Sequence, residues 1–464
     1  MENAIPTHQN SQNQNQTDGR ILIIPCPLQG HAAPLMKLSH QITKLGTNVT
    51  FLTTDLLHAR LSESERWDQG LRVISIPDGL EFQSSCKDQK LLHASLQRVM
   101  PGYMENLLKE ANQSSKMDDR ICGLIVDSPM AWMMEIPKKM GLKVAVFWCS
   151  TPGCLALGFK IPELLESKFI DSDGTPLQNE NIQLLPSLPA MDITELLWYF
   201  PSDANTQKSM FHIMKDIMRH IQNANWILCN WFQELSIAAS NLSTNILTIG
   251  PLLANGQSTG SFCSEDSTCL SWLEKQPKCS VVYVAFGSTS RFNQQQLDEL
   301  ALGLELMGRP FLWVAWSGLK DGSSPAYTNE YTKRVAGRGK IVEWAPQEAV
   351  LGHPSTACFV THCGWSSFME SLGMGVPLVC WPYFGDQLYT RTCVCDAWRV
   401  GRRLKPGEGG IVSMYEIKNK VEEVLSDGIV RENVLRLKGM ARNSISKGGS
   451  SLVNLEHMLK QMRC

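Results

Sequence analysis

The chain lacks the features that mark several large classes of protein. Its 43 basic residues are balanced by 45 acidic ones, for a formal net charge of −2, so the composition does not favour binding to nucleic acid. No uninterrupted apolar run reaches the length of about 18 residues that a membrane-spanning helix needs. Residues 1–19 are rich in Gln, Asn and Ser and lack the apolar core of a secretory signal peptide, so we expect a disordered tail there.

Common metal and cofactor signatures are also missing. The 15 cysteines are scattered, and no Cys-x-x-Cys pair occurs. This pattern argues against a zinc site or a disulfide framework and favours reduced thiols in a cytoplasmic protein. The chain has no GxxxxGK[ST], no HExxH and no GxGxxG after its first expected strand, which disfavours P-loop nucleotidases, zinc proteases and dinucleotide-dependent oxidoreductases.

Short apolar runs alternate with longer amphipathic stretches along the chain. This alternation is typical of parallel sheets that are covered by helices on both faces. A first set of strands is expected at 20–25, 49–53, 71–76, 121–126 and 144–148. A second set is expected at 280–286, 310–315, 340–343, 358–360 and 377–381. The chain is therefore predicted to fold as two doubly wound α/β domains in tandem.

The composition also places the boundary between these domains. Gly250-Pro251 closes the first set, and the residues that follow are rich in Gly, Ser, Thr and Asn, as expected of a linker. The expected division is a domain at 20–252, a linker at 253–268, a domain at 269–445, and a C-terminal helix at 446–464 that packs back on the first domain.

Two polar residues follow buried strands in the first domain. His31 stands near the start of a helix that Pro34 can open, where the positive helix end disfavours imidazolium and leaves a neutral imidazole able to act as a general base. Asp127 ends the strand at 121–126, where its carboxylate could orient His31. The alternatives are a packed or helix-capping histidine, and an aspartate that caps a turn near Pro129.

Residues 344–387 form the most unusual segment of the chain. Gly364 interrupts a strand and the next residues start a helix, whose unpaired N–H groups suit a phosphate. Trp344 offers a flat face for a nucleobase, and Glu370 can accept hydrogen bonds from ribose hydroxyls. A tryptophan-rich core with a capped helix would explain each residue alone, but it does not explain so many polar groups at strand ends.

This segment resembles the donor-binding signature of plant family-1 UDP-sugar glycosyltransferases, which it matches over 44 residues without a gap. Residues 25–31 and 282–288 also resemble family motifs, and Asp127 lies where the family carries the partner of its histidine. The resemblance implies a GT-B fold, in which two Rossmann-like domains face each other across a cleft. The first domain would bind mainly the acceptor and the second the nucleotide sugar.

The resemblance further implies inverting transfer of a sugar, with glucose favoured, from a UDP-sugar to a hydroxyl of a small lipophilic plant metabolite such as a phenolic, a flavonoid or a terpenoid. His31 would deprotonate the acceptor, and Asp127 would hold and charge-balance His31. The implied donor-binding residues are Ser288, Trp344, Gln347, His362, Trp365, Ser366, Ser367, Glu370, Asp386 and Gln387. The expected acceptor-binding residues are Phe82, Trp148, Leu197 and Phe384.

The resemblance also implies what does not take part. The UDP-sugar is a co-substrate, and no resident cofactor and no metal are expected, because a helix N-terminus and His362 would offset the charge of the leaving diphosphate. We expect a monomer whose partners are the donor and a small-molecule acceptor, without nucleic acid and without a membrane span.

Three positions depart from the family pattern. Ser366 stands where Asn is usual, Cys149 follows Trp148 where many members carry Thr or Ser, and Thr390 stands where Asn is common. Gln387 at the end of the signature resembles the glucose-preferring members. Two alternatives therefore stay open: another donor, such as UDP-xylose or UDP-galactose, and a non-catalytic relative that only binds ligands.

Overall fold

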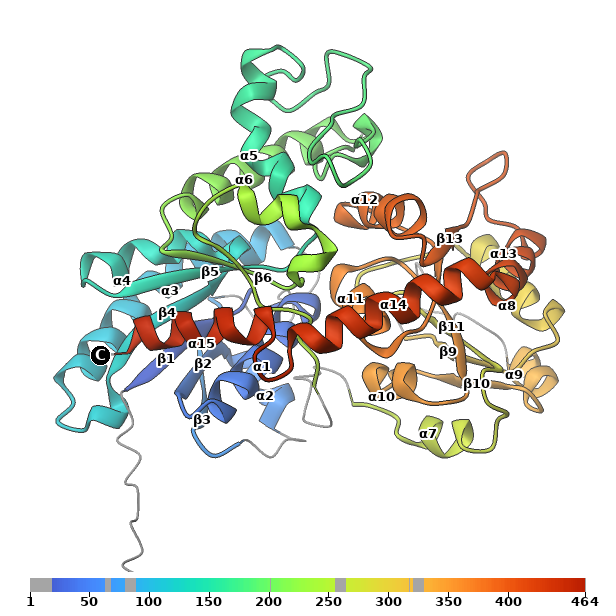
Figure 1. Ribbon diagram of the computed structural model, residues 1–464, viewed down its shortest axis with the longest axis horizontal. Helices are drawn as coiled ribbons and strands as arrows, with labels where there is room; N and C mark the ends of the chain where they lie inside the picture. Colours follow the sequence, from blue (N-terminus) through green and yellow to red (C-terminus); the bar gives the residue numbers. More distant parts are fainter. Residues whose placement is uncertain are drawn as a thin grey trace, which may run out of the picture.

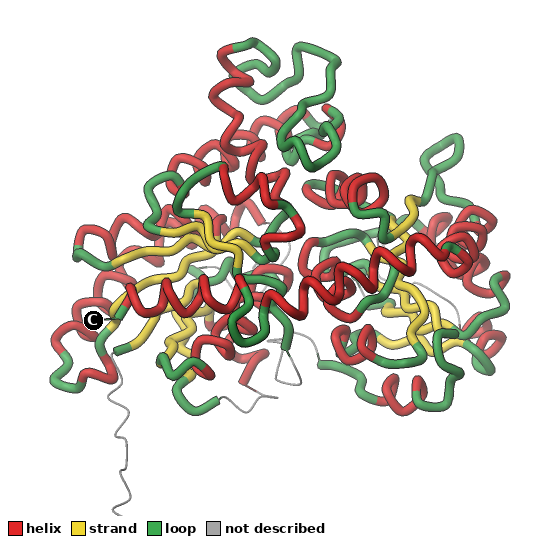
Figure 2. Tube along the Cα trace, viewed as in Figure 1, coloured by secondary structure: helices red, strands yellow, loops and turns green. Residues whose placement is uncertain are grey.

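The computed structural model describes residues 19–62, 68–79, 89–200, 202–254, 264–316, 318–319 and 329–463. These residues form two α/β domains, each built around one parallel sheet (Figure 1). Helices cover both faces of each sheet, as Figure 2 shows with the strands in yellow between red helices. The predicted fold class, two Rossmann-like domains in a GT-B arrangement, is confirmed.

The N-terminal sheet has seven strands in the order β3-β2-β1-β4-β5-β6-β7. Its strands are β1 (Arg20–Ile24), β2 (Asn48–Thr54), β3 (Leu71–Ile76), β4 (Ile121–Asp127), β5 (Lys143–Trp148), β6 (Trp226–Cys229) and β7 (Ile246–Thr248). Every residue of β1 and β4 is buried, because helices cover both faces, and this is why these strands are continuous apolar runs in the sequence. The short strands β6 and β7 were not predicted.

The helices of this domain are α1 (Gln29–Lys44), α2 (Asp55–Ser62), α3 (Gln89–Gln113), α4 (Glu135–Lys139), α5 (Pro152–Glu166) and α6 (Ala204–Ile221). Helix α1 begins at Gln29, before the predicted opening at Pro34, which lies inside the helix. Proline has no N–H, so the carbonyl of Gly30 loses its usual intrahelical donor four residues on. The segment after β4 is a 3₁₀ helix, Ser128–Met134, that leads into α4.

The C-terminal sheet has six strands in the order β10-β9-β8-β11-β12-β13. They are β8 (Val281–Ala285), β9 (Phe311–Val314), β10 (Gly339–Val342), β11 (Thr356–Thr361), β12 (Leu378–Cys380) and β13 (Gly401–Arg403). The helices are α7 (Thr268–Leu273), α8 (Gln294–Leu306), α9 (Asn329–Val335), α10 (Gln347–Gly352), α11 (Trp365–Met374), α12 (Asp386–Thr392), α13 (Met414–Ser426) and α14 (Gly428–Ser444).

The last helix, α15 (Ser450–Met462), returns to the N-terminal domain, where it lies against β7. Figure 1 shows α14 and α15 in red, running in succession across both domains. The hydroxyl of Ser451 donates to the carbonyl of Gly250 at 2.7 Å, and the amide of Asn454 donates to the carbonyl of Thr248 at 2.9 Å. Leu455 and Met458 are buried in the core of the N-terminal domain. The chain therefore connects its two domains twice, through the segment after Pro251 and through this helix.

Two predictions from the sequence concern membrane-spanning helices and the state of the cysteines. None of the described helices is long and apolar enough to cross a membrane. The described cysteines are free thiols except Cys122, which is disulfide-bonded. Cys122 is thus an exception to the expected reduced thiols, because spacing along the sequence does not report distance in the fold.

Candidate functional site

A cavity of about 1210 Å³ lies between the two domains and is lined by both. The strand register explains which residues meet there. Ile24 of β1 lies opposite Val126 of β4, and Asp127 lies opposite Phe147 of β5, so the residues that follow these strands share one edge of the sheet. In the other domain Thr361 of β11 is paired with both Ala285 and Cys380. The carboxyl ends of these parallel strands are where ligands bind in open α/β sheets.

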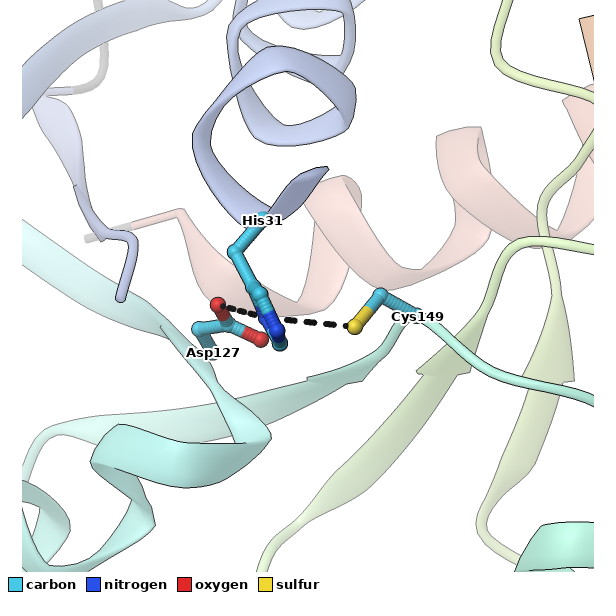
Figure 3. A group of neighbouring side chains, drawn as sticks. All are labelled: His31, Asp127 and Cys149. Atoms are coloured by element: carbon cyan, nitrogen blue, oxygen red, sulfur yellow. Dashed lines mark hydrogen bonds and ion pairs between the residues drawn. The ribbon is translucent and has the colours of Figure 1, made fainter. Parts of the chain in front are cut away.

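His31 and Asp127 meet at the edge of the N-terminal sheet. His31 lies in the first turn of α1, and its Nδ1 is 2.8 Å from Oδ2 of Asp127 (Figure 3). The same carboxylate oxygen accepts the backbone N–H of Cys26 at 3.0 Å, which fixes its orientation. Asp127 is fully buried, whereas the His31 side chain is 26% exposed and lines the cavity. Because Nδ1 faces the carboxylate, Nε2 is the nitrogen available to a substrate.

The surroundings of His31 change its protonation. Burial alone would lower the pKa of His31, but the charges of Cys149 and Asp127 and their hydrogen bonds raise it well above its ordinary value. The sequence predicted a neutral imidazole from the helix end alone. Direct contact with a buried carboxylate acts on the pKa of His31 in the opposite direction to the helix terminus, and the protonation state of the ring before reaction stays a prediction.

Cys149 is the third member of this group. Its Sγ lies 3.3 Å from Nδ1 of His31, and Figure 3 shows Asp127 and Cys149 on opposite sides of the imidazole ring. Burial raises the pKa of the Cys149 thiol, while His31 acts in the opposite direction. The sequence marked Cys149 only as a departure near the sugar, and the contact with His31 is apparent only in the structure.

The start of α11 and the loop after β8 form the side of the cavity where a diphosphate is expected. The imidazole of His362 is packed so tightly that a Cβ added at Gly287 or Gly364 would lie 2.7 or 2.4 Å from its Nε2. Gly287 also has a φ of +67°, which an L side chain rarely adopts. Burial lowers the pKa of His362 to about 4, so in the ligand-free protein this ring is a neutral hydrogen-bonding group.

Three of the predicted donor-binding residues form a hydrogen-bonded group at α10 and α11. The amide nitrogen of Gln347 donates to Ser367 Oγ at 2.9 Å and to Glu370 Oε2 at 2.7 Å. The hydroxyl of Tyr283 donates to the other end of the same amide, at 3.3 Å. This network fixes the Glu370 carboxylate at the wall of the cavity, where it can accept hydrogen bonds from vicinal hydroxyls. Ser288 and Trp344 line the same cavity.

Lys37 is a charged residue of the cavity wall that the sequence did not reveal. It comes from α1 in the other domain, and its ammonium group lies 2.5 Å from Glu370 and 3.0 Å from Glu348. The Lys37 side chain is only 3% exposed. The one available signal was a lysine among the apolar positions of an amphipathic helix, where a charge is buried only when it is paired.

Trp365 has a structural contact beside its predicted place in the donor site. Its indole is buried, and Nε1 donates to the carbonyl of Asn230 in the N-terminal domain at 2.9 Å. The ring also packs against Phe368 and Trp398. The indole of Trp365 therefore joins the two domains, while Trp365 lines the cavity and its backbone lies in the first turn of α11.

The two residues at the start of α12 are already engaged in the ligand-free protein. Oδ2 of Asp386 accepts the hydroxyl of Ser150 from across the cleft at 2.7 Å, and burial raises the pKa of this carboxyl. Oε1 of Gln387 accepts the backbone N–H groups of Tyr383 and Phe384 at 2.9 and 3.2 Å. The Gln387 amide oxygen thus shapes the loop before α12.

The predicted acceptor-binding residues Trp148, Leu197 and Phe384 line the cavity, whereas Phe82 lies outside the described residues. The sequence did not predict most of the apolar wall around them. It comes from α3, from the 3₁₀ helix after β4 and from α6, and includes Leu92, Leu96, Met130, Met210, Met214 and Ile217. Methionine side chains adapt their shape, so this wall can accept apolar ligands of different shapes and does not select one of them.

Comparison with known proteins identifies the family to which this chain belongs. The family described as UDP-glucoronosyl and UDP-glucosyl transferase matches residues 19–444. The chain is a plant family-1 UDP-glycosyltransferase. UDP-glycosyltransferase 83A1 of Arabidopsis thaliana is 35% identical to it over 97% of this chain and 98% of its own. Mogroside I-E synthase of Siraitia grosvenorii is 30% identical over 96% of this chain and 99% of its own.

A solved structure agrees with the fold of this glycosyltransferase. Phytolacca americana UGT2, complexed with UDP-2fluoro-glucose and pterostilbene, superposes with a TM-score of 0.79 at 25% identity, covering 96% of this chain and 99% of the other. The resemblance of segment 344–387 to the family is thus confirmed. The glycosyltransferase binds a UDP-sugar donor and a small-molecule acceptor and glycosylates small metabolites.

Proposed function

We propose that this glycosyltransferase transfers glucose from UDP-glucose, with inversion, to a hydroxyl of a small lipophilic plant metabolite such as a phenolic, a flavonoid or a terpenoid. The observation that carries the proposal is the 2.8 Å contact of His31 with Asp127 in a cavity shared with the donor-binding helix α11. The acceptor O–H gives its proton to Nε2 of His31, and the oxygen forms a bond to the anomeric carbon. The bond from that carbon to the diphosphate breaks, and UDP leaves with the electron pair.

Asp127 stabilises the imidazolium that this proton transfer creates. Because the buried carboxylate accepts from Nδ1, the ring has its free lone pair on Nε2 before transfer and a compensated charge after it. A general base of this kind contributes about 10²–10⁴-fold to a rate. The leaving diphosphate is stabilised by the N-terminus of α11, by Ser288 and Ser367, and by the neutral donor of His362. We propose that the reaction needs no metal and no resident cofactor.

Glucose is favoured as the donor by the residues at α12. Asp386 and Gln387 line the cavity next to the dyad, and both side chains can exchange their present partners for sugar hydroxyls. The UGT2 of Phytolacca americana was crystallised with UDP-2fluoro-glucose, which supports the same choice here. Trp344 is proposed to stack on uracil, and Gln347 and Glu370 to hold the ribose.

The apolar wall of the cavity supports a lipophilic acceptor. Pterostilbene, which is bound together with UDP-2fluoro-glucose in the UGT2 structure, supports an acceptor of this kind. We further propose that the enzyme acts as a monomer, since one chain supplies both sides of the cleft, and in the cytoplasm, where its free thiols stay reduced.

The test is a matrix of donors and acceptors followed by mass spectrometry of the products. UDP-glucose, UDP-xylose and UDP-galactose are each incubated with mixed phenolic, flavonoid and terpenoid alcohols. The proposal predicts a product heavier by one hexose with UDP-glucose, and a β-linkage by NMR. A product formed only with UDP-xylose or UDP-galactose would show that this UDP-sugar, and not UDP-glucose, is the donor. Ligand binding without any product would favour a non-catalytic relative.

A further inference from the structure

Three different metal-ligating groups converge on one point in the cleft. Nδ1 of His31 lies 2.8 Å from Asp127 Oδ2 and 3.3 Å from Cys149 Sγ, and the three ligand atoms all lie within 4.8 Å of one another (Figure 3). They come from α1, from the end of β4 and from the residue after β5, elements that the neighbouring strands β1, β4 and β5 hold in register. The cluster therefore lies at the carboxyl edge of the sheet, with Cys149 in the loop that directly follows β5.

The carboxylate of this cluster can accept a further ligand or hydrogen bond. Asp127 is fully buried, and its Oδ1 has no hydrogen-bond partner among the residues that the structure describes. Figure 3 shows both oxygens on the side that faces the imidazole. A buried carboxylate oxygen without a partner is costly, and a cation would satisfy it. His31 and Cys149 both line the cavity, so an ion could reach the cluster from the cleft.

We propose that His31, Asp127 and Cys149 bind Zn²⁺ reversibly and that the bound ion inhibits the enzyme. Imidazole, thiolate and carboxylate are the three ligand types of zinc sites, and three protein ligands plus a water is the usual open arrangement. Tetrahedral zinc with ordinary bond lengths places its ligand atoms about 3.3–3.7 Å apart. The two contacts of Nδ1 are shorter than or equal to this, and all three ligand atoms lie within 4.8 Å of one another, so a rearrangement of these side chains would admit the ion. A thiolate with imidazole selects zinc over magnesium or calcium, which prefer oxygen ligands.

The proton balance explains why the ion would inhibit. When zinc binds Nδ1, the proton of the neutral ring moves to Nε2, and the proton on Sγ goes to solvent. The zinc-bound ring keeps its remaining proton on Nε2. That nitrogen then has no lone pair, so it cannot accept the proton of an acceptor hydroxyl. UDP binding is unaffected, because the donor-binding residues of α10 and α11 do not take part.

The binding part of this inference stands on the cluster alone, and the inhibition part rests on the proposed role of His31. The experiment therefore measures both. Zinc binding is followed by calorimetry on the full chain after chelator treatment, and Co²⁺ is used as a spectroscopic substitute, because thiolate ligation produces a charge-transfer band. Turnover is measured over a zinc series, and each variant is compared with its own zinc-free rate. Cys149→Ala and Cys149→Thr remove the thiol, and Cys279→Ser is the control at an exposed thiol.

The expected result is inhibition that a chelator reverses, with a Co²⁺–thiolate band in the wild type and in Cys279→Ser. Cys149→Ala and Cys149→Thr should bind zinc at least about tenfold more weakly, since even an outer-shell partner is worth that much. They should lose inhibition to the same extent, while the affinity of the wild type for UDP stays unchanged by zinc.

Zinc binding that is equally strong without Cys149, or no charge-transfer band with Co²⁺, would overturn the site. Binding that depends on Cys149 without a loss of turnover would overturn the inhibition and would count against His31 as the base. A protein that transfers sugar normally but never binds zinc would overturn this inference alone and leave the proposed function intact.

Discussion

Lys37 of α1 and Glu370 of α11 form a buried ion pair that crosses the cleft, with Nζ 2.5 Å from Oε1. The two residues are separated by 333 positions in the sequence. Burial alone would lower the pKa of Lys37, but Glu370 and Glu348 raise it, so the ammonium group stays charged. Glu348 in turn accepts the backbone N–H of Ala254, in the segment that follows the N-terminal domain. The acceptor-side domain thus helps to orient the carboxylate proposed to hold the ribose.

Removing this lysine should weaken both the fold and the donor site. Lys37→Met leaves two buried carboxylates without their cation, which typically costs about 3–5 kcal/mol in the free energy of unfolding. We expect UDP affinity to fall by about tenfold or more, equivalent to about 1.4 kcal/mol, by calorimetric titration. Lys37→Arg should restore part of the affinity. The control is Lys44→Met, an exposed lysine on the same helix, and an equal loss of UDP affinity in this control would contradict the assignment.

The rate should depend on pH through His31. Because the pKa of His31 is raised above its ordinary value of 6.5, the base is protonated and inactive at low pH, and kcat should rise as the pH passes through the raised pKa. Asp127→Asn removes the negative charge that helps to raise it, so this limb should move to lower pH while the maximal rate falls. Initial rates at saturating donor and acceptor across the neutral and alkaline range provide the measurement. An unmoved limb in Asp127→Asn would show that another group titrates.

Ser366→Asn should tighten UDP-glucose binding, by at most about tenfold. Ser366 Oγ lies 3.4 Å from the carbonyl of Gly30, the carbonyl that Pro34 leaves without its helical donor. An Asn amide has two N–H donors and a longer reach, so it can contact a phosphate oxygen directly where the serine hydroxyl needs a water. The acceptor profile should not change. Donor titrations with several UDP-sugars decide this, and weaker UDP-glucose binding with lost activity would indicate a site built around serine.

Trp365→Phe tests the role of the Trp365 indole in joining the two domains. The variant leaves the buried carbonyl of Asn230 without its indole donor, which should lower the free energy of unfolding by about 1–3 kcal/mol. The preference among UDP-sugars should stay as in the wild type, because the indole is buried and its Nε1 donates to Asn230. Denaturant unfolding and a donor panel are the two measurements. A changed sugar preference at unchanged stability would support the role that the sequence suggested.

Local features of the sequence predicted some elements and site residues, whereas contacts between residues far apart in the sequence could not be predicted. Strands β1 and β4 were predictable because burial on both faces makes them continuous apolar runs, and His31 and Asp127 followed from their places at strand ends. Strands β6 and β7, with four and three residues, were missed, although the equally short β10 and β12 were predicted, so length alone does not explain the miss. The contacts of Lys37 with Glu370, and of Trp365 with Asn230, join residues distant in sequence, and no local pattern encodes them.

The central claim is that His31, supported by Asp127, removes the proton of the acceptor, and the most direct test is the turnover of His31→Ala beside its affinity for UDP. The account predicts a fall in kcat of about 10²–10⁴-fold with UDP binding nearly unchanged, since the donor residues of α10 and α11 remain in place. Turnover close to that of the wild type, measured at saturating donor and acceptor, would contradict it.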